Sequence, residues 1–325
     1  MRYSVLTQVE RRRRPRRRRP VALLALAAAL GSGGYWGVQH FRAHPEPAAA
    51  APKPAAASRR EHVTARPTRV ALLSTPARPR SGAPKVAAAS AILVDASSGA
   101  VLWQKRPHRR KPIASTTKIM TATLALERLR LGHVVIVAPG VPRTPLVREG
   151  LRARERVPVW KLLDGLLIFS GNDDALALAV AAGSSRRHFL GLMNDKAREL
   201  GLNDTHFASV SGVIDKDNYS SAWDLAALTR YARRDPRFRK IVATRIARVP
   251  WVAPTYGKVY VNKNALLGTY RGADGVKTGW TTVAGHCLVA SAHRNGVRLI
   301  AVLLRSPDPY GDARRLLNFG FALAR

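Results

Sequence analysis

The hydrophobic pattern divides the chain from residue 89 onward into strands at both ends and helices between them. Two apolar runs joined by a short Ser-Gly turn predict a β-hairpin over residues 89–105. Apolar positions at helical spacing, interrupted by a short strand at 134–138, then predict helices at residues 114–127, 157–169, 173–182, 187–200 and 222–233. Strand-like runs then return at residues 259–261, 275–278, 286–291 and 297–304. A last helix is predicted at residues 311–319. This order predicts one α+β domain over residues 89–325, with a sheet built from both ends of the domain and helices clustered on it.

The segment before this domain has the pattern of a targeting sequence. Residues 1–20 contain RRRRPRRRRP, a block of like charge that stays solvated or meets an anionic surface. Residues 21–41 begin with an apolar run, which predicts a signal peptide or signal-anchor. The basic end stays in the cytoplasm, so the rest of the chain is expected in the cell envelope, secreted or anchored to the cytoplasmic membrane. Residues 42–88 are rich in Ala, Pro, Arg and Ser and predict an extended linker.

Charge is the anomaly in the composition. The 325 residues include 55 Lys and Arg against 20 Asp and Glu, a formal net charge of +35. This excess is spread along the chain and favours anionic surroundings, such as nucleic acid, anionic lipid or a polyanionic cell wall. A nucleic-acid-binding arm is an alternative interpretation of residues 1–20, but no recognisable nucleic-acid fold accompanies it, so no specific nucleic-acid partner is expected. The single cysteine, Cys287, excludes an intramolecular disulfide, and its strand-like context predicts a buried thiol.

The first candidate motif, Ser115-Thr-Thr-Lys118, opens a predicted helix. Side chains three residues apart lie on one helical face, which brings the hydroxyl and the amine within reach of each other. Lys118 can accept the serine proton only if burial or nearby positive charge lowers its pKa. Viewed alone, the motif is explained more simply by Ser115 acting as a helix N-cap.

Two further motifs are equally weak when taken singly. Ser170 and Asn172 lie in a break between helices, where they could relay a proton and hold a carbonyl, or simply form a turn. Lys277 and Thr278 end a strand-like run and could bind a carboxylate, while Gly279 allows close approach of a substrate backbone. An ordinary polar strand end explains the third motif as well.

The order and spacing of the three motifs are more specific than any one of them. The two serines are 55 residues apart, and Lys277 follows 107 residues later. Motifs of this kind occur in penicillin-binding proteins and class A β-lactamases. The segments ILVDASSGAVLWQK, PIASTTKIMTATLALE, LLIFSGNDDALALA and GADGVKTGWTTVAGHCLVASA resemble the D-alanyl-D-alanine carboxypeptidases of peptidase family S11, low-molecular-mass penicillin-binding proteins, over roughly residues 89–321. The resemblance implies a penicillin-binding-protein/β-lactamase-like transpeptidase fold, with an antiparallel sheet and a helical cluster.

The resemblance also implies a serine acyl-transfer mechanism with three catalytic residues. Ser115 would attack the penultimate D-Ala of peptidoglycan stem peptides, Lys118 would be its general base, and Ser170 would pass the proton to the leaving amine. The acyl-enzyme is then hydrolysed by water. No cofactor or metal is expected, and β-lactams are expected as inhibitors.

Five residues are implied in substrate binding. Asn172 would hold the substrate amide and Thr278 the terminal carboxylate. Lys277 would tune the reacting hydroxyls electrostatically, and Gly279 would let the substrate approach. The backbone N–H groups of Ser115 and Trp280 would form the oxyanion hole.

Several alternatives remain open at this point. A DD-endopeptidase of peptide cross-links would use the same residues in a wider cleft. A class A β-lactamase needs a further glutamate, and Glu199, the one long acidic residue between the second and third motifs, looks like helix surface. The intact motifs argue against a catalytically dead wall-binding protein. Two departures from the family pattern stand out, because Trp280 is bulky and the loop after Arg305, a weak candidate for binding the carboxylate, is short.

Overall fold

The computed structural model describes residues 73–74, 82–213, 216–251 and 257–323. The predicted segments 1–20 and 21–41, and most of 42–88, lie outside the described residues. Within the described part of the chain, no helix is long and apolar enough to cross a membrane.

A five-stranded antiparallel sheet forms the centre of the domain. Its strands run in the order β2-β1-β11-β10-β9, with bounds Val101–Lys105, Ser90–Asp95, Val297–Leu304, Gly285–Arg294 and Ala273–Thr281. Strands from the two ends of the domain are therefore neighbours, and β1 pairs directly with β11. This confirms the predicted sheet, and the predicted buried thiol of Cys287 lies in β10.

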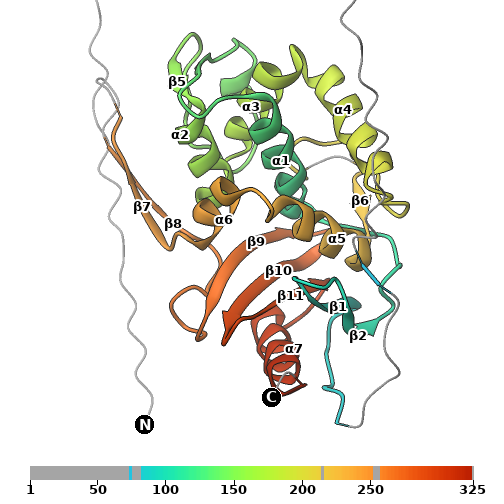
Figure 1. Cartoon of the computed structure of the whole chain (residues 1–325). Coiled ribbons are helices and arrows are strands. Elements are labelled where there is room, and N and C mark those ends of the chain that lie inside the picture. Colours follow the sequence, from blue (N-terminus) through green and yellow to red (C-terminus); the bar gives the residue numbers. More distant parts are fainter. Residues whose placement is uncertain (1–72, 75–81, 214–215, 252–256, 324–325) are drawn as a thin grey trace, which may run out of the picture. The chain divides into compact units, whose positions relative to one another are not determined.

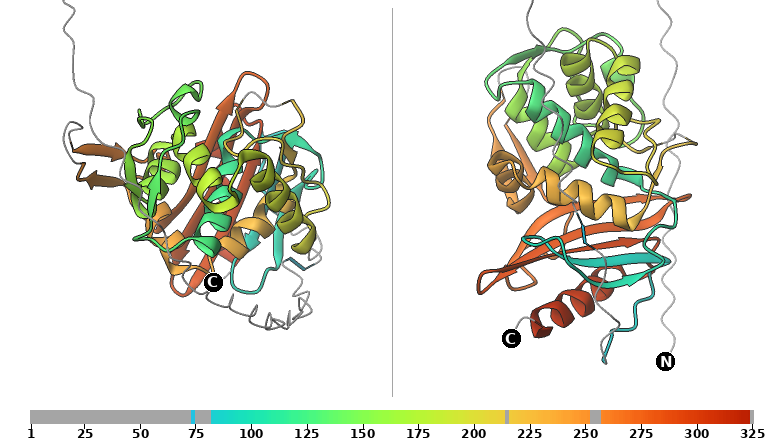
Figure 2. Two further views of the ribbon diagram at one scale, coloured as in Figure 1. Left: turned by 90° about the horizontal axis from the view of Figure 1, so that it is seen from above. Right: turned by 45° about the vertical axis from the view of Figure 1, so that its right-hand side comes forward.

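The sheet separates two hydrophobic cores (Figures 1 and 2). A cluster of helices covers one face of the sheet, and α7 (Pro309–Leu323) lies on the other. Alternate residues of the central strands point to opposite faces, so Ile92 and Val302 pack toward the helical cluster while Leu93 and Leu303 pack toward α7. All four side chains are fully buried, and each contributes roughly 1.5–3 kcal/mol of transfer free energy.

The helical cluster contains most of the predicted helices. Its helices are α1 (Lys118–Arg128), α2 (Val159–Asp164), α3 (Asn172–Gly183), α4 (Arg186–Glu199), α5 (Ala222–Ala232) and α6 (Pro236–Ala243), together with the short turns η1 (Ala114–Thr117), η2 (Val141–Arg143) and η3 (Gly165–Phe169). Short strand pairs lie around it: β3 (Lys111–Pro112) with β6 (Tyr219–Ser220), β4 (Val134–Ile136) with β5 (Arg156–Pro158), and β7 (Ile246–Val249) with β8 (Lys258–Val261).

Two regions differ from the sequence-based expectations. The helix predicted over residues 157–169 begins only at Val159, because Val157 pairs with β4 in a strand, and it ends in the π-helical turn η3. Helix α6 was not predicted, since it buries only Phe238 and Val242. Its start nevertheless has a local signal, because the Asp235 side chain accepts a hydrogen bond from a backbone N–H in the first turn, ahead of a proline.

A buried carboxylate joins the segment before β1 to α7. Asp312 accepts hydrogen bonds from the backbone N–H groups of Ala87 and Ala88, from Ser306 Oγ at 2.7 Å and from Arg315 at 2.6 Å. Burial opposes ionisation, but these donors outweigh it and hold the pKa of Asp312 below its usual value. The packed domain thus includes residues just before the predicted boundary at residue 89.

We expect Asp312→Ala to lower the free energy of unfolding by about 3 kcal/mol, because it leaves several buried donors without an acceptor. Urea unfolding at neutral pH measures this change. Asp195→Ala, which removes an exposed carboxylate from the surface of α4, should change stability by less than about 1 kcal/mol. Equal effects of the two substitutions would contradict the structural role of Asp312.

Candidate active site

Ser115 and Lys118 meet at the start of the first helix of the cluster. Ser115 lies in the 3₁₀ turn η1, and Lys118 is the first residue of α1. Ser115 Oγ and Lys118 Nζ are 3.0 Å apart, which confirms the predicted contact. The N-cap interpretation of Ser115 is wrong, because Ile113 and Thr117 occupy the cap positions of η1 and α1.

The Lys118 amine is completely buried and contacts two carbonyl oxygens. Nζ lies 2.7 Å from Asn172 Oδ1 and 3.0 Å from the backbone oxygen of Ser211. Asn172 begins α3, and its Nδ2 donates to the backbone oxygen of Pro145 at 3.0 Å, which fixes the oxygen toward the amine. Three segments distant in sequence therefore converge on one nitrogen atom. The contribution of Ser211 is a backbone atom, so its residue type gave no signal in the sequence.

Burial and neighbouring cations both act on the ionisation of the site. Burial lowers the pKa of Lys118 well below its usual value, and the positive charge of Lys277 lowers it further. Lys277 is itself buried, and burial together with Lys263 lowers its pKa to about 7. Burial and the positive charge of Lys277 therefore both favour the uncharged form of Lys118, the state that a lysine base requires.

The Lys277-Thr278-Gly279 motif lies in β9, the strand at one edge of the sheet. It falls inside β9, which continues to Thr281, so the motif does not end the strand as the sequence suggested. A β-carbon at position 279 would lie 2.8 Å from the backbone nitrogen of Ser115. Only glycine therefore lets β9 approach η1 this closely.

A cavity of about 350 Å³ opens between β9 and the helical cluster. Ser115, Ser170, Thr278, Gly279 and Trp280 are among the residues that line it. The backbone of Ser170 is left-handed, with φ +76°, where the π-helical turn η3 ends. The indole of Trp280 is 60% exposed. The cavity thus brings together residues from all three sequence motifs.

Lys263 is a further lining residue that the sequence analysis missed. It lies in the loop between β8 and β9, and its ammonium is 5.3 Å from the centre of the Phe169 ring. Nothing in the local sequence distinguishes Lys263 from an ordinary surface lysine. Arg305, the weak candidate for binding a carboxylate, does not line the cavity, and its Nη1 donates to the backbone oxygen of Val283.

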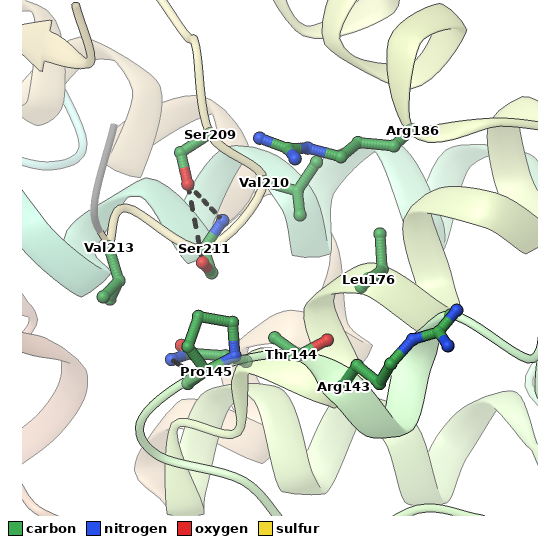
Figure 3. A pocket seen from close by; sticks show the side chains of 11 residues that line it. Arg143, Thr144, Pro145, Leu176, Arg186, Ser209, Val210, Ser211 and Val213 are labelled. Carbon is green, nitrogen blue, oxygen red and sulfur yellow. Dashed lines mark hydrogen bonds between the residues drawn. The ribbon is translucent and has the colours of Figure 1, made fainter. Parts of the chain in front are cut away.

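A second cavity, of about 280 Å³, lies on the helical side of Asn172 and Ser211 (Figure 3). Leu176 and Val210 contribute apolar surface, and the side chain of Arg186 extends toward the loop that carries Val210. Asn172 and Ser211, which line this cavity, both contact Lys118, so the cavity is adjacent to the contacts of this amine.

Buried carboxyl groups lie next to the Ser170-Asn172 turn and hold the segments around it in place. Asp173 accepts hydrogen bonds from three successive backbone N–H groups, at residues 149–151. Asp174 and Glu149 lie close together, since a β-carbon at Gly165 would be 2.6 Å from Asp174 Oδ1 and 2.5 Å from Glu149 Oε2. Burial, and then Glu149, raise the pKa of Asp174 well above its usual value. A protonated Asp174 supplies the donor that two carboxylates side by side would lack.

Comparison with known proteins agrees with this geometry. The sequence profile of the D-alanyl-D-alanine carboxypeptidase family, Peptidase_S11, matches residues 77–308. The chain is 34% identical over 245 residues to D-alanyl-D-alanine carboxypeptidase DacF of Bacillus subtilis, covering 72% of this chain and 62% of the relative. It is 35% identical over 260 residues to a D-alanyl-D-alanine carboxypeptidase of Streptomyces sp. (strain K15), covering 74% and 89%. The chain thus spans less than two thirds of the Bacillus relative.

Solved structures give the same result. The DD-transpeptidase of Streptomyces K15 has a TM-score of 0.70 and 34% identity, over 74% of this chain and 99% of that one. A D-alanyl-D-alanine carboxypeptidase from Mycobacterium tuberculosis has a TM-score of 0.71 and 31% identity, over 77% and 96%. The fold is therefore that of the penicillin-binding DD-peptidases. The chain belongs to peptidase family S11, the D-alanyl-D-alanine carboxypeptidases.

We expect Asp174→Asn to change how stability depends on pH. The folded-state pKa of Asp174 lies above that of the unfolded chain, so the wild type loses stability as the pH rises through the folded-state value. Asparagine keeps a donor without a charge. The variant should therefore be about 1–3 kcal/mol more stable than wild type at pH 8, with a smaller difference at pH 4.

Thermal or urea unfolding from pH 4 to 8 measures this difference. Asp195→Asn, on the exposed surface of α4, should leave the wild-type pH dependence unchanged. Parallel curves for wild type and Asp174→Asn would show that Asp174 is ionised in the folded protein.

Proposed function

We propose that this protein is a serine-type D-Ala-D-Ala carboxypeptidase that removes the terminal D-Ala from peptidoglycan stem peptides. The observation that carries the proposal is the contact of 3.0 Å between Ser115 Oγ, which lines the cavity beside β9, and the buried Lys118 Nζ. Family membership and the names of the relatives support the same activity.

The contacts of Lys118 support its role as the general base. A neutral amine has two N–H donors and one lone pair. The oxygens of Asn172 and Ser211 can only accept, so they take the two N–H groups. The lone pair then faces Ser115, whose hydroxyl donates to it. This is the arrangement that a base needs before it removes the serine proton.

Acylation then proceeds in two proton transfers. Ser115 Oγ bonds to the carbonyl carbon of the penultimate D-Ala while its proton passes to Lys118. The amide bond to the terminal D-Ala breaks, and Ser170 relays a proton to the leaving amine. The backbone N–H groups of Ser115 and Trp280 stabilise the oxyanion, and Asn172 holds the substrate amide. Water hydrolyses the ester and restores Ser115.

The two cavities suit the two ends of such a substrate. The cavity beside β9 is lined by Thr278 and Lys263, a hydroxyl and a cation suited to the terminal carboxylate, and the adjacent Lys277 is buried. The cavity behind Asn172 is available for the part of the stem peptide that precedes the scissile bond. The rest of the proposal follows from the sequence: residues 21–41 target the chain to the cell envelope, or anchor it to the cytoplasmic membrane, and residues 42–88 act as a tether.

Two related activities are distinguished by the fate of the acyl-enzyme. A DD-endopeptidase would release cross-linked peptides instead of D-Ala. A β-lactamase would hydrolyse its penicillin adduct quickly, which requires an acidic residue near the ester. No carboxylate is among the described residues that line the cavity beside β9, and Glu199 pairs with Lys196 on the surface of α4. A long-lived penicillin adduct is therefore expected.

The first test is labelling of the full chain with a fluorescent penicillin, followed over hours, together with D-Ala release from a peptide ending in D-Ala-D-Ala. Wild type should form a stable adduct and release D-Ala. Ser115→Ala should form none and lose at least about 10³-fold in turnover. Ser97→Ala, at an exposed turn, should behave as wild type. A folded wild type without an adduct would refute the proposal, and rapid loss of the adduct would indicate a β-lactamase.

The second test is the pH dependence of acylation. Because only neutral Lys118 accepts the proton, the acylation rate should rise with pH through the lowered pKa of this amine. Lys277→Gln removes a positive charge that lowers the pKa of Lys118, so the rising limb should move to higher pH and the rate at pH 7 should fall roughly 10²-fold.

The rate of penicillin labelling, measured between pH 5 and 10, gives the rising limb for wild type and for Lys277→Gln. Lys240→Gln, an exposed position on α6, removes the same charge outside the cavity and should leave the profile unchanged. An unshifted limb in Lys277→Gln would mean that Lys277 does not set the basicity of Lys118.

A further inference from the structure

Five arginines surround a third cavity, of about 270 Å³, which shares no lining residue with the two cavities at the catalytic residues. It lies among α5, α6, the turn after β1 and the start of β11, elements labelled in Figure 1. Its arginines are Arg230, Arg233, Arg234, Arg239 and Arg298, and Ala96 and Ser97 complete the lining.

Protein contacts hold the arginine side chains in place. Arg230 donates to the backbone oxygens of Ala96 and Ser97 at 2.8 and 2.6 Å. Arg239 Nη1 donates to the backbone oxygens of Arg233 and Arg234 at 2.6 and 3.0 Å. Backbone carbonyl oxygens fix a guanidinium without neutralising it, so these contacts bring the positive charges together and leave them in place.

Among the described residues, few carboxylates lie near the positive charge of the five arginines. Asp274 contacts two of the arginines, at 2.7 Å from Arg233 Nη2 and 3.1 Å from Arg298 Nε. Asp95 acts on Arg230, but its Oδ1 also accepts from the turn that follows it. Among the residues that the structure describes, Asp274 and Asp95 are therefore the two carboxylates seen to act on the five guanidinium groups.

Arg233 is the most buried of the five arginines, and neighbouring positive charges act on it. Its side chain is only 5% exposed, and its Nε is buried without a hydrogen-bond partner among the described residues. Burial lowers the pKa of Arg233, and Arg298 and Arg239 lower it further, against the opposing effect of Asp274. A bound anion would relieve this repulsion.

We propose that this cavity is an anion site that binds a phosphate group, carried by free phosphate, a small phosphate ester or a lipid headgroup. A guanidinium presents planar pairs of N–H donors that match the oxygens of phosphate, and it stays charged at all physiological pH values. The volume is several times the ~30 Å³ that one water molecule occupies in the liquid, which leaves room for a tetrahedral oxyanion. The five arginines of this cavity are part of the excess of basic residues in the chain, and the proposed catalytic mechanism does not use them.

The test compares two charge reversals in the full chain. Arg234→Glu changes an exposed arginine that lines the cavity and lies over the Tyr231 ring. Arg156→Glu changes an exposed arginine of β5, which does not line the cavity. Both variants have the same net charge and keep residues 1–20, so general electrostatic attraction to anions is matched. Arg234→Gln is a milder variant in case the reversal disturbs folding.

The first measurement is the shift of the unfolding midpoint with inorganic phosphate and glycerol 3-phosphate, at ionic strength kept constant with NaCl. Ligand binding to the folded state alone raises the midpoint. We expect a rise in wild type and Arg156→Glu, with apparent affinity reduced about tenfold in Arg234→Glu and less in Arg234→Gln. The second measurement is sedimentation with phosphatidylglycerol vesicles, and with phosphatidylcholine vesicles as the uncharged comparison.

The outcomes separate the sources of phosphate. A defect of Arg234→Glu with the soluble ligands supports a site for free or esterified phosphate. A defect only with phosphatidylglycerol supports the lipid headgroup. If Arg234→Glu and Arg156→Glu behave alike with every probe, binding follows net charge alone and the proposal is wrong. Penicillin labelling should be unchanged in both variants, which keeps this result independent of the proposed function.

Discussion

The burial of one amine is the constraint on which the rest of the site depends. Moving an ammonium ion out of water costs several kcal/mol even after the protein relaxes. Burial lowers the pKa of Lys118 and so favours its neutral form, and its N–H groups donate to the side-chain oxygen of Asn172 and the backbone oxygen of Ser211. The same contacts tie the start of α1 to the start of α3 and to the loop after α4. The hydrogen bonds that hold the helical cluster together are therefore the same ones that, in the proposed mechanism, prepare Lys118 to activate Ser115.

The neighbouring structure holds these partners in register. The side-chain amide of Asn172 is oriented by the Pro145 backbone oxygen, and the turn before it rests on the carboxyl pair of Asp174 and Glu149. On the other side, Gly279 lets the edge strand reach the backbone of Ser115. A small displacement of the Asn172 turn or of β9 would separate Ser115 and Lys118 from their partners, and the proposed reaction depends on distances near 3 Å between these groups.

The sequence predicted the parts of this arrangement that leave a local pattern. Apolar strands at both ends of the domain predicted the sheet, and the three-residue spacing within the first motif predicted the contact of Ser115 with Lys118. Other parts arise only from tertiary contacts. The left-handed backbone of Ser170 follows a π-helical turn that helical periodicity cannot distinguish from an α-helix. Lys263 lies in a loop whose local sequence carries no motif, and Asp174 lies close to Glu149, a residue of a different segment.

The three lysines of the site provide a further link between charge and chemistry. Lys263 and Lys277 both lower the pKa of Lys118, and Lys263 also lowers that of Lys277. A substrate carboxylate bound beside Lys263 would stabilise positive charge there and on Lys277. In the proposed mechanism, the anionic end of the substrate would therefore act on the same lysine charges that lower the pKa of Lys118.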